Sequence, residues 1–397
     1  MEVPFKLVLF VLVKLAGMGE FMGEFIKGMD VSTLIEQEQC GAKYYNHGKE
    51  GDLLTILKEY DVNSVRLRLW NDPYGNNGEP YGAGTNDLEK TIQMAKRAKK
   101  LGMSFLLDFH YSDFWADPGK QIPPKAWRGM SDTELEKAVY DFTLDTMKRL
   151  QEEGVTPDLV QVGNELTNGL LWPTGRKHGK GEPGYEEAFD AIAAYINAGI
   201  RGVRALDENI PIMLHLDNGG LNAMYREWFD HFMERGEEFQ IIGFSYYPFW
   251  HGTLEELEYN MKDMAERYHK ELIVAEVSMG FSMEDYRSYE KLSPELCKGM
   301  ATKPEMVEKL PYPMTPQGQS DFMQDIMGRI ASINGGRGFY YWEPGWIPVP
   351  GCGWATAEAL AYTGEQGPGG NEWANQALFD YEGNALPALE TIKNFKL

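Results

Sequence analysis

Two glutamates, Glu165 and Glu276, each stand at the end of a short apolar run that is typical of a buried strand. Glu165 ends the segment LVQVGNE, and Glu276 ends the segment LIVAE. A carboxylate at such a place is costly without a partner, so Arg66 or Arg68 would pair with Glu276 if its role were only structural. Two carboxylates about 5–5.5 Å apart, one a nucleophile and one an acid and then a base, hydrolyse a glycosidic bond with retention. We therefore predict that Glu165 is the acid/base and Glu276 the nucleophile, with a structural carboxylate as the alternative.

Asn164 directly precedes the first of these glutamates, and its amide can hydrogen-bond a sugar 2-hydroxyl, a contact that strengthens in the transition state. Further polar and aromatic residues gather where the apolar runs end, namely Asp30, Arg66, Arg68, Asp108, His110, His215, Asp217, Tyr246, Tyr247, Trp342 and Glu343. In barrel enzymes the carboxyl ends of the strands carry the active site. The last two runs lead into EVSMG and WEPGW instead of a glycine-rich phosphate loop, which argues against a sugar-phosphate enzyme.

Eight β-rich runs alternate with longer segments that carry apolar residues at helical spacing. The predicted strands are Phe25–Asp30, Asn63–Trp70, Ser104–His110, Leu159–Asn164, Pro211–Leu216, Ile241–Tyr247, Leu272–Glu276 and Gly338–Trp342. The predicted helices are Asp87–Leu101, Ser131–Glu153, Tyr185–Leu206, Ala223–Arg235, Leu254–Tyr268, Gln319–Asn334 and Leu386–Asn394. This alternation indicates an α/β fold, a parallel sheet closed into a (β/α)8 TIM barrel. No linker divides residues 23–397, so we expect a single catalytic domain.

Two long connections follow the seventh and eighth predicted strands, over Val277–Thr315 and Pro344–Asn375. Both leave the carboxyl-end face of the expected barrel, and loops of this length are usually functional. We predict that they form walls of a cleft. Cys297 in the first and Cys352 in the second could form a disulfide between them, and two free thiols are the alternative.

The charge of the chain restricts its partners. Its net charge is −22, its pI is near 4.8, and no basic run interrupts the acidic balance. This charge repels nucleic acid and anionic membrane surfaces, and it disfavours a polyanionic substrate. Aromatic residues make up 13% of the chain, and aromatic rings stack on sugar faces as well as filling cores. We expect a neutral polysaccharide as substrate, with no nucleic-acid or membrane partner.

The first 22 residues contain the apolar run VLFVLV, which is typical of the core of a signal peptide. Glu2 offsets Lys6, Lys14 interrupts the run, and a clean cleavage site is missing. The run is too short to span a bilayer. We interpret residues 1–22 as an atypical or truncated signal, which predicts a secreted or periplasmic protein; an extra packed segment is the alternative.

Several long motifs resemble glycoside hydrolase family 53, the endo-β-1,4-galactanase family of clan A. They are VRLRLWNDPY (65–74), LLDFHYSDFWADPGKQIPPKAW (106–127), VQVGNELTNGLLWPTG (160–175), SYYPFWHGTLEEL (245–257), IVAE (273–276), FYYWEPGWIPV (339–349) and NQALFDYEGNALPAL (375–389). The resemblance runs from about residue 25 to residue 397. It implies a retaining (β/α)8 barrel that cleaves β-1,4-galactosidic bonds in the galactan or arabinogalactan side chains of pectin by double displacement.

Carried over residue by residue, the resemblance makes Glu165 the acid/base and Glu276 the nucleophile. It implies that the residues binding the substrate around them are Arg66, His110, Asn164, Tyr247 and Trp342. Tyr247 would hydrogen-bond the nucleophile, and Tyr246 would point the other way by strand alternation. Trp115 and Trp127 either stack on distal sugars or are simply packed. Among the other strand-end residues, we expect Asp108 to orient neighbours, His251 to bond a sugar or a loop carbonyl, and Glu343, the rival carboxylate, to belong to a turn with Pro344.

The resemblance leaves other functions open. A clan A relative that cleaves another neutral β-1,4-glycan, such as mannan or cellulose, would share the fold and both carboxylates, and a non-catalytic glycan-binding barrel is a further alternative. We expect no required cofactor, no metal at the site and a monomeric protein. Bacterial members of the family often bind calcium in the loop after the seventh strand, but the oxygen ligands Glu284, Asp285 and Glu290 are sparse here, so the sequence does not predict a calcium site.

Overall fold

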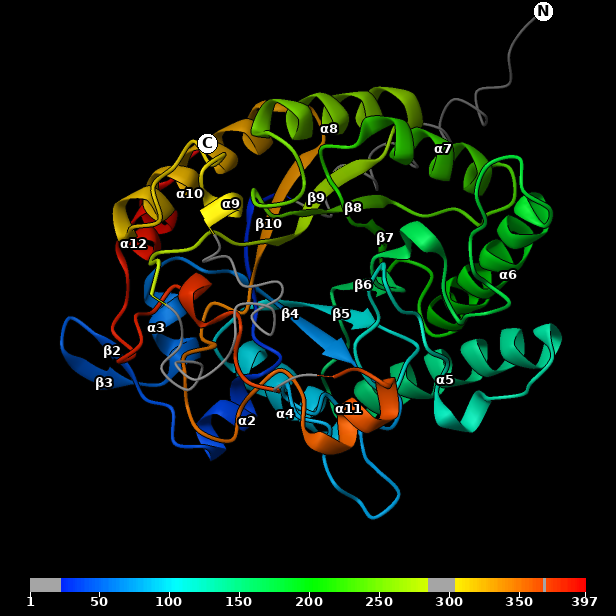
Figure 1. Ribbon diagram of the computed structural model, residues 1–397, viewed down its shortest axis with the longest axis horizontal. Coiled ribbons are helices and arrows are strands. Elements are labelled where there is room, and N and C mark those ends of the chain that lie inside the picture. The colour runs from blue at the N-terminus through cyan, green and yellow to red at the C-terminus, as the bar shows by residue number, and fades with distance from the viewer. Residues whose placement is uncertain (1–22, 285–303, 367–368) are drawn as a thin grey trace, which may run out of the picture.

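The computed structural model describes residues 23–284, 304–366 and 369–397. The predicted signal segment, residues 1–22, therefore lies outside the described residues. Figure 1 shows a ring of strands at the centre of the molecule with helices around it. Within the described part of the chain, no helix is long and apolar enough to cross a bilayer.

Eight parallel strands close into a barrel, which confirms the predicted (β/α)8 fold. In chain order they are β1 (Ile26–Asp30), β4 (Ser64–Leu69), β5 (Ser104–Phe109), β6 (Leu159–Val162), β7 (Ile212–Leu216), β8 (Ile241–Tyr246), β9 (Glu271–Val277) and β10 (Gly336–Trp342). Each strand pairs with the next in this order, and β1 closes the ring by pairing with both β10 and β4. Every predicted strand overlaps an observed one, so the sequence periodicity located them correctly.

The helices between the strands cover the outside of the barrel. They are α3 (Leu53–Glu59), α4 (Leu88–Lys100), α5 (Asp132–Glu152), α6 (Tyr185–Arg204), α7 (Asn222–Met233), α8 (Leu254–Tyr268), α10 (Pro316–Ser332) and α12 (Pro387–Asn394), with two short helices, α9 (Pro304–Val307) and α11 (Ala357–Thr363), inside the late loops. The first connection was not predicted in detail. It contains α2 (Leu34–Gln39), a hairpin of β2 (Tyr44–Asn46) and β3 (Lys49–Gly51), and then α3, and these elements are too short to give a clear period.

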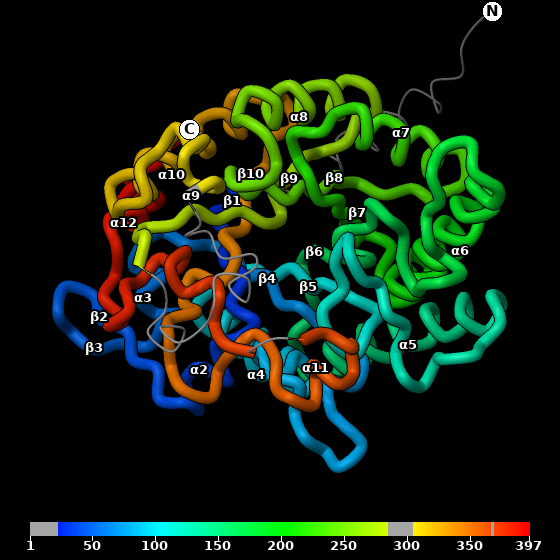
Figure 2. The backbone as a smooth tube through the Cα atoms, in the orientation of Figure 1, coloured from blue at the N-terminus to red at the C-terminus, as the bar shows by residue number. Residues whose placement is uncertain are grey.

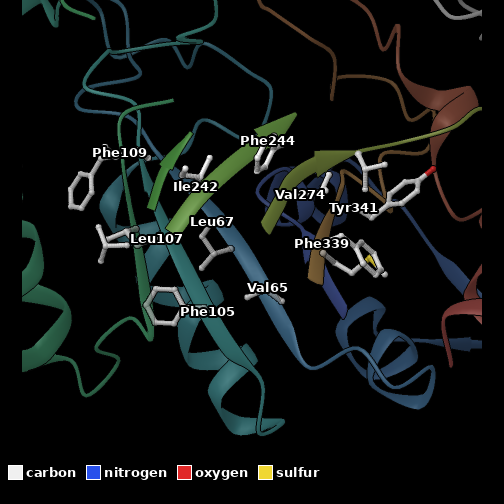
Figure 3. Close-up of a cluster of buried hydrophobic side chains, with 14 of the residues drawn as sticks. Val65, Leu67, Phe105, Leu107, Phe109, Ile242, Phe244, Val274, Phe339 and Tyr341 are labelled. Atoms are coloured by element: carbon white, nitrogen blue, oxygen red, sulfur yellow. The ribbon is translucent and has the colours of Figure 1, made fainter. Parts of the chain in front are cut away.

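Alternation along the strands separates the core into two layers. Side chains that point outward from the strands face the helices, and Figure 3 labels several of them: Val65, Leu67, Phe105, Leu107, Phe109, Ile242, Phe244, Val274, Phe339 and Tyr341. The smaller layer lies within the barrel and contains Ile26, Leu106, Leu159, Met213, Ile241, Ile273, Ala275 and Tyr340. Above that layer the inward positions become polar, so the barrel interior is divided into an apolar floor and a reactive upper end.

The eighth connection leaves β10 and crosses the carboxyl-end face before the chain reaches α12. Figure 2 shows it in orange and red, with α11 lying beside the segment that follows β4. Backbone hydrogen bonds hold this placement, because Ala83 N donates to Gly353 O at 3.0 Å and Thr356 N donates to Tyr81 O at 3.0 Å. The long loop is therefore fixed over the upper end of the barrel by the second connection.

Candidate active site

A cavity of about 560 Å³ opens at the carboxyl ends of the barrel strands. The predicted site residues that line it are His110, Trp115, Asn164, Glu165, Tyr247, Glu276 and Trp342. The eighth connection contributes Trp354, Leu360, Glu365, Gln366, Glu372 and Trp373 to its wall, as the loop length predicted. None of the described residues of the seventh connection lines the cavity, and positions 285–303 of that loop lie outside the described residues.

The two predicted catalytic carboxylates face each other across this cavity. An oxygen of Glu165, an oxygen of Glu276 and a ring nitrogen of His215 all lie within 4.8 Å of one another. Retaining glycosidases hold their carboxyl groups about 5–5.5 Å apart, whereas inverting ones need roughly 6.5–9.5 Å to admit a water molecule. The separation here therefore fits attack by one glutamate on the anomeric carbon, with the other glutamate at the leaving oxygen.

A bulge in β9 directs Glu276 into the barrel. Val274 pairs with Phe244 of β8, but the next paired residue on β8, Ser245, lies opposite Glu276 and not opposite Ala275. The pairing with β10 shows the same extra residue, because Phe339 pairs with Val274 and Tyr341 with Val277. Strict alternation would place Glu276 on the same outward face as Leu272 and Val274, so the bulge is what turns the carboxylate inward.

Arg66 of β4 binds Glu276 and several of its neighbours. Its Nη1 atom lies 2.9 Å from Glu276 Oε1 and 2.9 Å from Asp30 Oδ2, and its Nη2 atom lies 2.8 Å from Asp108 Oδ2. The guanidinium is completely buried, and the surrounding carboxylates raise its pKa, so it stays charged. The structural and the catalytic interpretation of Glu276 both predict this ion pair, because an arginine that pairs with Glu276 also favours the ionised nucleophile.

Tyr247 is the second donor to Glu276, since its hydroxyl donates to Oε2 at 2.7 Å. Tyr246 points outward and donates to Gly252 O at 2.9 Å, as strand alternation predicted. Burial raises the pKa of the Glu276 carboxyl, while Arg66 and the Tyr247 hydroxyl act in the opposite direction. Glu276 is therefore a buried carboxylate with one donor at each oxygen and a fixed orientation.

Glu165 has different surroundings. It follows β6 in a left-handed conformation, with φ of 46°, which costs roughly 1–2 kcal/mol for a residue other than glycine. Ser245 Oγ donates to its Oε1 atom at 2.6 Å. Burial, then Glu276 and then Asp217, raise the pKa of the Glu165 carboxyl well above its usual value. A carboxyl group that remains protonated near neutral pH can act as a general acid.

Asn164 is held by four contacts. Its Oδ1 atom accepts from Arg66 Nη2 at 2.9 Å and from Gln161 Nε2 at 3.0 Å, and it lies 3.0 Å from His215 Nδ1. Its Nδ2 atom donates to Ala116 O at 2.8 Å, which leaves one amide hydrogen for a ligand in the cavity. The residue therefore links the surroundings of Glu276 to the loop that carries Glu165.

Aromatic side chains line much of the cavity. Trp115 and Trp354 stack at a centroid distance of 4.6 Å, and Trp342 meets Trp373 edge to face at 4.9 Å. Arg68 lies against this group, with its guanidinium carbon 4.6 Å from the centre of the Trp115 ring and 5.4 Å from that of Trp342. Such a surface suits the apolar faces of sugar rings. Trp354 and Trp373 were not singled out from the sequence, because nothing local distinguishes them from core tryptophans.

Trp127 does not join the site. The short helix that ends at this residue places its ring against Phe142 at 6.0 Å and Tyr111 at 6.4 Å, between the barrel and α5. It is only 8% exposed and is not among the residues that line the cavity. The structure therefore corrects its prediction as a sugar-binding residue in favour of the packing alternative.

The remaining strand-end residues orient their neighbours. His110 lines the cavity, but its Nε2 atom contacts Asp108 at 3.0 Å and its Nδ1 atom accepts from Trp70 Nε1 at 3.1 Å. Asp108 therefore contacts both His110 and Arg66, as expected of an orienting residue. His251 Nδ1 lies 3.1 Å from the carbonyl oxygen of Ser245, which is the loop-carbonyl contact considered from the sequence.

Glu343, the rival carboxylate, lies outside the cavity. It pairs with Arg68 Nη2 at 2.6 Å and accepts from Thr33 Oγ1 at 2.5 Å. It is 1% exposed, and burial raises its pKa to about 7. Its contacts are those of a structural carboxylate, as the adjacent proline suggested.

The group formed by Glu165, His215 and Glu276 has the spacing of possible metal ligands. However, His215 Nε2 contacts Ser245 Oγ at 2.8 Å and His215 Nδ1 contacts Asn164 and Gln161, so neither ring nitrogen is available without breaking these contacts. Most of the loop considered for calcium binding, residues 285–303, lies outside the described residues. Cys297 of the considered disulfide lies in the same segment. Cys352 is buried and free.

Comparison with known proteins agrees with this geometry. A family model described as glycosyl hydrolase family 53 matches residues 26–392. The endo-β-1,4-galactanase of Bacillus subtilis (strain 168) is 38% identical over 400 residues, which cover 96% of this chain and 87% of that protein. The arabinogalactan endo-β-1,4-galactanase of Thermothelomyces thermophilus is 33% identical over 376 residues, covering 92% of this chain and 98% of that protein.

A solved structure gives the same assignment. The family 53 catalytic domain of Ignisphaera aggregans superposes with a TM-score of 0.82 and is 38% identical, covering 93% of this chain and 95% of the other. The match of the family model spans nearly all of the barrel, including both glutamates and the loops that wall the cavity. The chain therefore belongs to glycosyl hydrolase family 53.

Proposed function

We propose that this protein is an endo-acting, retaining β-1,4-galactanase that hydrolyses galactan or arabinogalactan. The observation that carries the proposal is the pair of carboxylates within 4.8 Å of each other at the open end of the barrel. Family membership and relatives that are named endo-β-1,4-galactanases support the choice of substrate. The aromatic walls of the cavity support a neutral polysaccharide as ligand.

In the first step, Glu276 attacks the anomeric carbon of the galactosyl unit, while Glu165 gives its proton to the departing glycosidic oxygen. Arg66 and Tyr247 hold the two oxygens of Glu276, so the nucleophile enters the reaction in a fixed orientation. Formation of the ester bond removes the negative charge of Glu276. The pKa of Glu165 then falls, because the charge of Glu276 is one of the causes that raise it.

In the second step, Glu165 is ionised and accepts a proton from a water molecule, which attacks the same carbon and releases Glu276. Two inversions at one carbon give overall retention. The same carboxyl group serves as acid and then as base because its surroundings change in charge between the steps.

The proposal is tested by one assay on linear β-1,4-galactan, mannan and cellulose, with analysis of product lengths over time. We expect hydrolysis of galactan, with intermediate oligosaccharides appearing before short products. Preferred cleavage of mannan or cellulose would assign a different β-1,4-glycan. Binding of galactan without any release of reducing ends would indicate a non-catalytic barrel.

We also propose that the reaction needs no cofactor. Apart from the substrate and one water molecule, every group used in the two steps belongs to this chain, and glutamates supply the first proton and the nucleophile. Dialysis against EDTA should leave the rate on galactan unchanged when it is measured at a temperature well below unfolding. Loss of rate that Ca²⁺ restores would instead point to a cation that supports the loops.

The remaining expectations concern the setting of the enzyme. We propose that it acts as a monomer outside the cytoplasm on the galactan side chains of pectin, and the signal-like apolar run VLFVLV supports this location. Fractionation of the producing cells tests the location, and light scattering during size-exclusion chromatography tests the oligomeric state. Confinement to the cytoplasm, or a mass of twice the 45.1 kDa chain, would overturn the respective proposal.

A further inference from the structure

A buried serine contacts the acid/base glutamate, and a buried histidine contacts that serine. Ser245 Oγ donates to Glu165 Oε1 at 2.6 Å, and His215 Nε2 lies 2.8 Å from Ser245 Oγ. We propose that Ser245 and His215 are positioning residues that hold Oε1 of Glu165, so that Oε2 is the oxygen that exchanges the proton with the substrate. This proposal rests on the proposed function, because it assigns the partners of its acid/base.

Both partners are inaccessible to solvent, since Ser245 and His215 are each 0% exposed. Both lie on the inner face of the barrel, Ser245 on β8 and His215 on β7. Glu165 lines the cavity, and within the described part of the chain its Oε2 atom receives no hydrogen bond. The contact with Ser245 therefore distinguishes the two oxygens, because one is bonded to the protein and the other is left for a ligand.

The direction of these hydrogen bonds follows from counting the hydrogens that each group can donate. A serine hydroxyl has one hydrogen, and Ser245 gives it to Glu165. Its contact with His215 is therefore satisfied only if Nε2 carries a hydrogen and donates to Ser245 Oγ. His215 is neutral, because burial first, and then Arg66 and two other histidines, lower its pKa well below the usual value. A neutral ring with its hydrogen on Nε2 has an unprotonated Nδ1, which must accept a hydrogen bond.

Gln161 supplies that hydrogen bond. Its Nε2 atom lies 3.1 Å from His215 Nδ1, 3.0 Å from Asn164 Oδ1 and 3.0 Å from Gly163 O, so its two hydrogens can serve the ring nitrogen and one of the two oxygens. Nδ1 also lies 3.0 Å from Asn164 Oδ1, which accepts from Arg66, so in this tautomer no hydrogen lies between the ring nitrogen and that oxygen. Gln161 is itself buried and receives a hydrogen bond from Arg66 Nε at 3.2 Å. A chain of hydrogen bonds thus runs from Arg66 through Gln161, His215 and Ser245 to Glu165, and each residue in it donates to the next.

This direction suits both forms that Glu165 adopts during catalysis. When the carboxyl is protonated on Oε2, Oε1 is a carbonyl-like oxygen that accepts from Ser245. When the carboxyl is ionised in the covalent intermediate, Oε1 still accepts from Ser245, and no group needs to turn. The opposite arrangement, with the hydrogen of His215 on Nδ1, would make Ser245 an acceptor and move the proton of Glu165 to Oε1, away from the sugar.

The first test uses leaving-group dependence, which separates positioning of the acid from general structural damage. We would measure Ser245→Ala on two aryl β-1,4-galactobiosides, one with a phenol leaving group and one with dinitrophenol. Loss of one hydrogen bond to a charged group, worth about 1.5–3 kcal/mol, should lower kcat/KM for the phenyl substrate by roughly 10- to 100-fold. The dinitrophenyl substrate needs little protonation, so its rate should change by less than about 3-fold. Ser245→Thr, which keeps the hydroxyl, should restore the phenyl rate.

Ser64→Ala is the matched control. Ser64 is also a buried serine on a barrel strand, 1% exposed, and it contacts the Tyr340 hydroxyl at 2.9 Å at the opposite end of the barrel. It should leave the rates of both substrates unchanged. An equal loss on both substrates for Ser245→Ala, or no rescue by threonine, would overturn the proposal.

The second test observes the wild-type protein and does not depend on activity. Nitrogen-15 NMR of the histidine-labelled wild-type protein should show His215 as the neutral tautomer with its hydrogen on Nε2, assigned by its loss in His215→Gln. A hydrogen on Nδ1 would contradict the direction of the chain. If the wild-type enzyme cleaved neither galactoside, the proposed function would fail, while the tautomer would still report on the chain.

Discussion

The two glutamates of the site are chemically identical residues in opposite electrostatic surroundings. Glu276 has a charged arginine at one oxygen and a tyrosine hydroxyl at the other. Glu165 has a neutral serine at one oxygen and the carboxylates of Glu276 and Asp217 among its neighbours. Burial raises both pKa values, but only at Glu276 does a cation oppose it.

This difference explains how two carboxyl groups in one site can have different protonation states and therefore different roles. A nucleophile must be ionised when the substrate binds, and an acid must be protonated at the same moment. The cation belongs to β4 and the second acidic neighbour to the loop after β7, so the division of roles is made by strands far apart in the chain.

The largest effect is expected from removing the nucleophile. Glu276→Ala should reduce turnover of galactan on the order of 10⁴- to 10⁶-fold, as removal of a central catalytic group does in other covalent mechanisms. Reducing-end release from galactan measures the rate. Glu271→Gln at the half-buried start of the same strand is the control and should keep normal turnover, and comparable activity in both variants would refute the role of Glu276.

Removal of the acid should be costly only where the leaving group needs a proton. Glu165→Ala should lower kcat/KM on galactan by about 10²–10⁴-fold, which is the usual contribution of general acid–base catalysis. With a dinitrophenyl galactobioside the first step should stay fast, so a burst of dinitrophenol should precede slow turnover. A uniform loss on both substrates, without a burst, would remove the distinction between the two glutamates.

A smaller effect should follow from weakening the orientation of the nucleophile. Tyr247→Phe removes the 2.7 Å hydrogen bond to Glu276 and should reduce kcat by roughly 10- to 100-fold, the equivalent of about 1.5–3 kcal/mol. Tyr246→Phe is the matched control, because that hydroxyl bonds Gly252 on the outer face of the barrel. Similar kcat values for the two variants would show that the hydrogen bond from Tyr247 to Glu276 does not contribute to kcat.

The smallest effect concerns pH. The negative charge of Asp217 raises the pKa of Glu165, so Asp217→Asn should lower that pKa and move the alkaline limb of the kcat/KM profile to lower pH. The pKa of Asp217 is itself raised, chiefly by burial, to about 6. Below this pH the wild-type residue is neutral, so the two profiles should converge there. A shift of the alkaline limb to higher pH would contradict the sign of the interaction.

Much of the barrel could be predicted from the sequence because its strands are short runs of regular pattern, and both glutamates stand at their ends. The hairpin of β2 and β3 was not predicted, because strands of three residues are too short to give a periodic signal. The bulge in β9 could not be predicted either, since alternation from Leu272 onwards would turn Glu276 outward. The position of a carboxylate was therefore predictable, but not the local geometry that directs it.

The aromatic residues show a second limit. Trp115 and Trp127 look alike in the sequence, both in the loop after the third predicted strand, yet one lines the cavity and the other packs under α5. Their positions depend on contacts with residues distant in the sequence, since Trp115 packs against Trp354 and Trp127 packs against Phe142. Ser245 is a similar case, because its contact with Glu165 joins residues 80 positions apart.

The division of roles between the two glutamates is tested most directly by azide rescue with determination of product configuration. In Glu165→Ala, azide should attack the covalent intermediate from the face that water normally uses, and NMR should show the β-galactosyl azide. In Glu276→Ala, azide should replace the missing nucleophile on the opposite face and give the α-galactosyl azide from the dinitrophenyl substrate. The reverse pairing of variants and configurations would contradict the assignment of Glu165 as acid/base and Glu276 as nucleophile.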